Sequence, residues 1–216
     1  HETSTAESAP VDADDHFFRD HHRAASAVDT DALLRCRTLF DAIQQILSAG
    51  ALTTSPEGSQ DDREVTATPQ RRAADISRAV RASGFGQGDA PFVMAHYAVH
   101  LLKRPRQAGS AKNLKASTAL RYWETLKPGF LDFAFDVHLP DLEEDEITAL
   151  YTKVVSAAGG IADEQTPTSL PGHARRRKLK EDSDAGQRAL SELVDFHEFA
   201  HKIYGLEDPD WSEIAP

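Results

Sequence analysis

Apolar residues recur at intervals of three and four along most of the 216-residue chain, and this spacing limits the fold to helices. The clearest stripe runs from Leu33 through Cys36, Phe40 and Ile43 to Leu47. Similar stripes lie near residues 73–80, 92–102, 120–130, 147–155 and 189–203. No segment keeps the two-residue alternation of a half-buried strand for more than a few residues. We therefore predict an all-α fold with about six helices.

Capping and breaking residues indicate where these helices begin and end. Thr30 offers an N-cap for the first helix, and Thr68-Pro69 has the order expected at the start of the second. Pro128 is expected to kink or interrupt the helix that follows Ser117, because a proline ring clashes with the preceding turn. The last helix is predicted from about Gln187 to Tyr204, with Gly205 just beyond its end.

The distribution of these signals predicts three parts. Residues 1–29 are acidic and poor in large apolar side chains, so we expect a flexible tail. Residues 30–104 form an N-terminal helical subdomain, and residues 108–216 form a second helical domain. An insertion at about 158–186 within the second domain shows no apolar periodicity.

Cysteine content and hydropathy exclude several classes of protein. The single cysteine, Cys36, excludes an internal disulfide framework and a cysteine-rich zinc module, and its place in an apolar stripe predicts a buried side chain. No apolar run reaches the roughly 20 residues of a membrane helix, and no signal-type segment is present. We expect a cytoplasmic protein with no membrane partner. The first residue is a histidine, which suggests a piece of a longer protein.

Charge is distributed in blocks along the chain, although the formal net charge is −11. Residues 1–31 carry eight acids against two arginines, and residues 132–146 carry seven acids without a Lys or Arg. In contrast, residues 103–121 hold six Lys or Arg residues and no acid, and a second basic block spans residues 175–180. An acidic protein can contact DNA phosphates only where its positive charge gathers on one face.

The pattern His197-Glu198-Phe199-Ala200-His201 fits the HExxH signature of zinc peptidases. Two histidines one turn apart can share a Zn²⁺ ion, and the intervening glutamate can polarise a metal-bound water. Catalysis needs a third protein ligand, and downstream only acids are available: Glu207, Asp208, Asp210 and Glu213. The chain also lacks the β-sheet that precedes this helix in such enzymes. We therefore expect no metal, no cofactor and no catalytic residue here.

A longer pattern of helices and apolar positions covers residues 108–214. It comprises KASTALRY at residues 115–122, FLDF at 130–133, ITALY at 147–151, RALSELVDFHEF at 188–199, and YGL at 204–206. This pattern resembles the core-binding, SAM-like domain of tyrosine recombinases, the phage-type integrases. The catalytic half of an integrase is absent from the chain.

The resemblance implies that the chain clamps double-stranded DNA during integration or recombination, self-associates on it, and performs no catalysis itself. Ser117 is expected to cap a helix whose N-terminus, together with nearby basic residues, would hold phosphates. The DNA-contacting residues expected on this basis are Lys103, Arg104, Lys112, Lys115, Ser117, Thr118, Arg121, Arg175, Arg176, Arg177, Lys178 and Lys180.

Two alternatives from other classes stay open. The first is a zinc metallopeptidase that uses His197, Glu198 and His201. The second is a helical interaction module whose acidic faces meet a basic partner.

Overall fold

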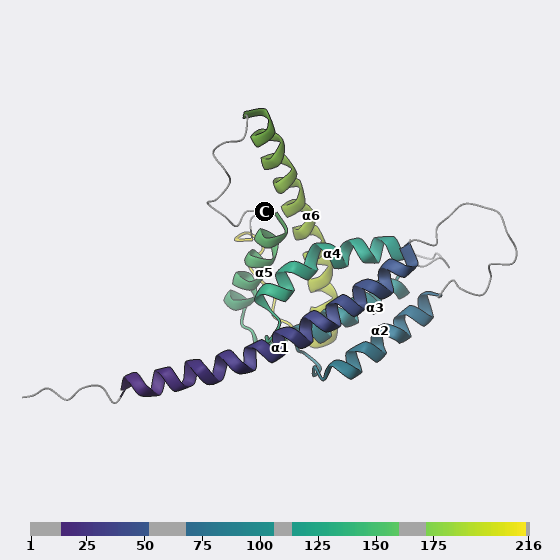
Figure 1. Cartoon of the computed structure of the whole chain (residues 1–216). Helices are drawn as coiled ribbons and strands as arrows, with labels where there is room; N and C mark the ends of the chain where they lie inside the picture. The colour runs from purple at the N-terminus through teal and green to yellow at the C-terminus, as the bar shows by residue number, and fades with distance from the viewer. Residues whose placement is uncertain (1–13, 52–67, 106–113, 160–171, 215–216) are drawn as a thin grey trace, which may run out of the picture.

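The computed structural model describes the backbone of residues 14–51, 68–105, 114–159 and 172–214, and the side chains of 30–49, 68–105, 114–158 and 184–214. These residues form helices and connecting turns, with no strand among them, as the sequence predicts (Figure 1). The elements are α1 (Asp14–Ala51), α2 (Pro69–Ser83), α3 (Ala90–Lys103), α4 (Ala116–Phe133), the 3-10 turn η1 (Leu139–Asp141), α5 (Glu144–Gly159) and α6 (Gly172–Tyr204).

Helix α2 begins at the residues that the sequence indicates. The Arg71 N–H donates to the Thr68 hydroxyl oxygen over 3.3 Å, and Pro69 occupies the first helical position. Gly84 ends the helix with a φ of +75°, a left-handed conformation that glycine adopts without a side-chain clash.

One hydrophobic core joins the helices on both sides of the expected subdomain boundary. Phe40 of α1 meets Trp123 of α4 edge to face, with ring centroids 4.9 Å apart. Phe196 of α6 contacts Tyr97 of α3 and Phe130 of α4 in the same geometry. Buried side chains from residues 36 to 102 and from 119 to 214 therefore form a single cluster, and the boundary near residues 104–112 does not divide it.

Helices α4 and α5 approach each other closely at Gly129. A Cβ at this position would lie 2.7 Å from the Cα of Val154, which is closer than packed side chains allow. Helix α4 also continues through Pro128 to Phe133, so the expected interruption does not occur.

Helices α1 and α6 are longer than the sequence predicts. Helix α1 begins at Asp14 rather than after Thr30, and α6 begins at Gly172 rather than near Gln187, within the expected insertion. Figure 1 shows the first parts of both helices extending away from the packed helices. Hydrophobic periodicity detects a helix by the apolar face that it packs into a core, and therefore gives no signal for a stretch without an apolar stripe.

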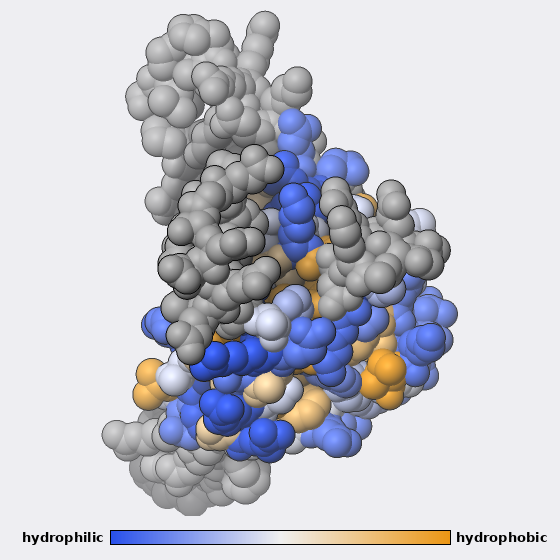
Figure 2. Space-filling view, turned by 90° about the vertical axis from the view of Figure 1, so that its right-hand side faces the viewer, coloured by the Kyte–Doolittle hydropathy of each residue, from blue (hydrophilic) through white to orange (hydrophobic). Residues whose placement is uncertain are grey.

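The described surface carries few large apolar side chains. Cys36 is buried as expected, whereas Leu34, Phe133 and Ile203 are exposed. On the face shown in Figure 2, hydrophobic residues lie in small separate groups between hydrophilic ones. None of the described helices is both long and apolar enough to cross a bilayer.

Candidate functional site

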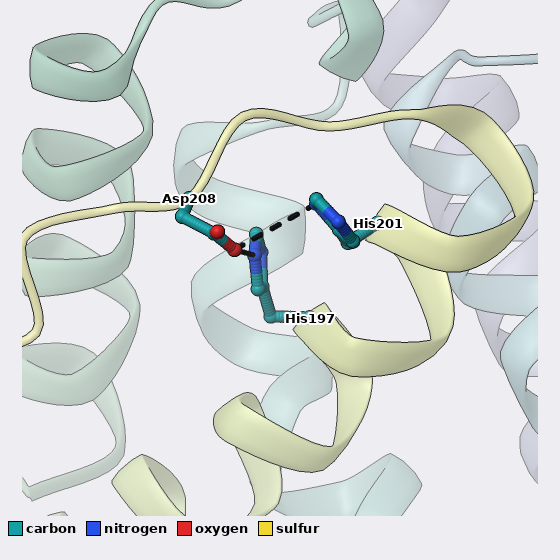
Figure 3. Close-up of side chains that lie close together, drawn as sticks. All are labelled: His197, His201 and Asp208. Carbon is teal, nitrogen blue, oxygen red and sulfur yellow. Dashed lines mark hydrogen bonds and ion pairs between the residues drawn. The ribbon is translucent and has the colours of Figure 1, made fainter.

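The end of α6 brings two histidines and an aspartate together (Figure 3). His197 and His201 lie one turn apart on one face of α6. Gly205 then adopts a φ of +73°, which ends the helix, and the following residues return Asp208 to the two rings. The His197 Nε2–Asp208 Oδ1 distance is 3.0 Å, and the His201 Nδ1–Asp208 Oδ1 distance is 3.7 Å. One ligand atom from each residue lies within 4.8 Å of the others.

Each imidazole is oriented by a partner on its Nδ1 atom. The His201 Nδ1–H donates to the Leu206 carbonyl over 2.6 Å, because a carbonyl can only accept, and Nε2 is the ring nitrogen not used in this bond. The buried Tyr151 hydroxyl of α5 lies 3.1 Å from His197 Nδ1. Such second partners fix ring orientation in histidine sites that bind metals.

Burial and hydrogen bonding set the protonation states of the cluster. Burial lowers the pKa of His197 and outweighs the opposite effect of Asp208, so this imidazole is neutral at neutral pH. The hydrogen bond from His197 lowers the pKa of Asp208, so the carboxylate is ionised. Since an ionised carboxylate only accepts, Nε2–H donates to Asp208 and Nδ1 accepts from the Tyr151 hydroxyl.

The segment that carries Asp208 is anchored on α5. The Asp210 N–H donates to the Thr148 hydroxyl over 2.9 Å, and Leu206 and Ile214 are buried in the core. Asp208 itself is 73% exposed, so it has room to adjust its position. Glu198, the central residue of the HExxH pattern, is also exposed.

Sequence reasoning identified the two histidines but not their third partner. Asp208 was one of four downstream acids, and nothing in the spacing singled it out. The nearest signal is Gly205, because a glycine in a left-handed conformation ends a helix and changes the direction of the chain just before Asp208.

The six predicted DNA-contacting residues with described side chains lie around the α3–α4 junction. The Leu114 N–H donates to the Arg104 carbonyl over 2.8 Å, which closes this junction. Lys103 and Lys115 are exposed on either side of it. Helix α4 begins at Ala116 with Lys115 as its N-cap, so the expectation that Ser117 caps the helix is wrong. Ser117 is exposed and Thr118 is half-buried in the first turn.

Both arginines of this group are paired with carboxylates of α6. Arg104 contacts Asp195 at 2.5 Å, and Asp195 also accepts from the Tyr97 hydroxyl. Arg121 contacts Glu192 at 3.1 Å. The Glu192 side chain is only 3% exposed, and burial raises the pKa of its carboxyl group. These pairs remove two positive charges from the surface that would face DNA.

The other predicted DNA contacts lie outside the described side chains. Lys112 falls between the described segments. Five more fall within the span of α6, but the structure does not describe their side chains: Arg175, Arg176, Arg177, Lys178 and Lys180.

No family model, curated protein or solved structure matches the chain. The histidine cluster and the α3–α4 junction are therefore interpreted from their own geometry.

Proposed function

We propose that, contrary to the sequence expectation of no metal, the chain is a zinc-binding protein whose centre is formed by His197, His201 and Asp208. The observation that carries this proposal is the grouping of two imidazole nitrogens and a carboxylate oxygen within 4.8 Å of one another. Zinc prefers nitrogen and oxygen ligands at roughly 2.0–2.2 Å in tetrahedral geometry. Ligand atoms around such an ion lie about 3.4 Å from one another, so the three atoms must draw closer together. The exposed side chains of Asp208 and His201 can supply that movement.

Binding of the ion requires one proton to change position within the cluster. The His197 Nε2–H proton that now faces Asp208 must leave so that Nε2 can bind the metal. The neutral ring then carries its proton on Nδ1, which donates to the Tyr151 oxygen. Tyr151 can therefore partner His197 in either tautomer, first as donor and then as acceptor.

Three protein ligands would leave a fourth position for water, which is the arrangement of catalytic rather than structural zinc sites. A zinc ion held here would lower the pKa of a bound water, and Glu198 follows His197 in the sequence, where the HExxH pattern places a general base. The reaction class that such a centre would support is hydrolysis.

The test is zinc titration by calorimetry, with metal content measured after dialysis. We expect one tightly bound zinc per chain in the unmodified protein and loss of that zinc in His201→Ala. His100→Ala is the matched control, because His100 is an exposed histidine on α3 outside the cluster. Equal zinc affinity in both variants would show that the metal binds elsewhere among the ten histidines.

We also propose, as a second candidate function, binding of duplex DNA at the α3–α4 junction. The supporting observation is the Leu114–Arg104 backbone bond, which brings residues 104 and 114 of the basic stretch together beside the N-terminus of α4, which lacks a side-chain cap. The resemblance to integrase core-binding domains favours the same surface, with self-association on DNA and a cytoplasmic location as further predictions.

Salt-dependent DNA titrations test this second function. Replacement of Lys103 and Lys115 by alanine should weaken binding to all sequences equally and make the salt dependence shallower by about 0.9 per lost phosphate contact. Lys153→Ala is the control, because Lys153 is an exposed lysine of α5 that lies over Phe133, at the end of α4 away from the junction. Absence of binding at low salt, or binding indifferent to the double substitution, would refute DNA binding at this surface.

A further inference from the structure

A pocket of about 320 Å³ opens between α2, α3 and the last turn of α6. Its walls are mainly apolar and include Phe92 and Val99 of α3 and the half-exposed Ile203 of α6. This volume lies at the lower end of the roughly 300–1,000 Å³ that small-molecule sites occupy. The pocket shares α6 with the histidine cluster, but none of the three cluster residues lines it.

One cationic side chain stands at this pocket. Arg81, in the last turn of α2, is exposed and forms no ion pair with any residue whose side chain the structure describes. Arg78, one turn earlier on the same helix, is instead paired with Asp75 at 3.2 Å. The positive charge of Arg81 is therefore available to a ligand.

A second polar group in the pocket is an imidazole–phenol pair. His96 Nδ1 and the Tyr204 hydroxyl oxygen are 2.6 Å apart. Burial lowers the pKa of His96 and raises the pKa of Tyr204 to about 12, so both groups are neutral at pH 7. If the Tyr204 hydroxyl donates to His96 Nδ1, the His96 Nε2–H is not used in the pair. If His96 Nδ1–H donates instead, the Tyr204 hydroxyl hydrogen is not used in the pair. Either arrangement leaves one hydrogen-bond donor beyond the pair.

We infer that this pocket binds a small carboxylate with an apolar body. The guanidinium of Arg81 would pair with the carboxylate, and the spare donor of the His96–Tyr204 pair would give it a second hydrogen bond. The apolar walls would cover the body of the ligand. A neutral ligand of the same shape would leave Arg81 unpaired, so the site should discriminate by charge.

Octanoate is a suitable probe, and octanamide is its neutral counterpart. Binding is measured by calorimetry and by shifts of the methyl signals of Val99 and Ile203 in NMR spectra. We expect octanoate to bind at least about tenfold more tightly than octanamide. Arg81→Gln should abolish this preference, whereas Arg78→Gln should keep it because Arg78 does not line the pocket.

The same titration in His201→Ala separates this inference from the zinc centre. We expect the variant to bind octanoate as the unmodified protein does. Loss of octanoate binding in His201→Ala would mean that octanoate binds at the metal centre, and it would overturn the inference. Equal affinity for octanoate and octanamide, no binding in the millimolar range, or a preference that survives Arg81→Gln would also overturn it.

Discussion

The sequence indicates two candidate sites, the histidine cluster at the end of α6 and the basic residues of the α3–α4 junction. Their side chains have different kinds of partner in the structure. At the cluster, two histidines close in sequence gain Tyr151, Leu206 and Asp208 as partners. At the junction, Arg104 and Arg121 are paired with carboxylates of α6, which leaves Lys103 and Lys115 exposed.

The difference concerns how each set of polar groups is held. His197 is buried, and its ring nitrogens have hydrogen-bond partners on both sides, so its orientation is fixed. The lysines at the junction project into solvent, where screening weakens any single charge. A ligand site requires polar groups with fixed orientations. Buried hydrogen-bond partners fix such orientations, whereas a run of like charges in the sequence does not. Four predictions test this contrast, from the largest expected effect to the smallest.

Tyr151→Phe should lower zinc affinity by about tenfold, because loss of an oriented second partner typically costs 10–100-fold. The substitution keeps the buried ring and removes only the hydroxyl that contacts His197. Zinc titration of the variant measures the effect, and Tyr122→Phe is a control tyrosine outside the cluster. An unchanged affinity in Tyr151→Phe would mean that His197 needs no support from α5.

Arg121→Gln should destabilise the fold by about 1 kcal/mol, because the half-exposed arginine partners a buried carboxylate. Urea unfolding at pH 7 measures the change in the free energy of unfolding. Arg78→Gln removes an exposed arginine paired on its own helix and should cost less. Equal costs would show that the burial of Glu192 adds nothing to the pair.

Glu192→Gln should change the pH dependence of stability in a defined direction. Burial raises the pKa of Glu192 in the folded protein, so this group favours folding below its ordinary value of 4.5 and loses that contribution as pH rises through the raised pKa. The glutamine side chain does not ionise, so the variant does not lose stability in this way. Its stability relative to the unmodified protein should therefore rise between pH 4 and pH 7, as unfolding curves at several pH values would show. A relative stability that falls over this range would contradict the prediction.

Lys103→Gln combined with Lys115→Gln should change the free energy of unfolding by less than about 0.5 kcal/mol, because both side chains are exposed. Thermal unfolding measures this, and it shows whether the DNA titrations report on binding rather than on folding. A larger loss would mean that the lysines stabilise the junction.

Sequence periodicity predicted the buried parts of the fold well for a physical reason. The apolar stripe from Cys36 to Leu47 is the face of α1 that enters the core, and packing requires apolar groups at that spacing. The same reasoning missed the starts of α1 and α6, where the helices extend beyond the packed helices. It also divided the chain at the junction, although the Phe40–Trp123 contact crosses that division.

The candidate site was only half predictable. His197 and His201 are four residues apart in the sequence, and helix geometry alone then places their side chains side by side. The position of Asp208 depends on the turn at Gly205 and on the bond between Asp210 and Thr148, a residue far away in the sequence. The partner Tyr151 is separated from His197 by 46 residues, and only the packing of α5 against α6 brings them together.

The backbone bond between Leu114 and Arg104 has a consequence for the connectivity of the chain. Because residues 104 and 114 are neighbours in space and the core spans both halves, a protease cut between them would leave two pieces that stay associated. For the same reason, the protein should accept new chain ends at this point in a circular permutant. The junction joins two stretches of sequence, but the buried aromatic rings hold the two halves together.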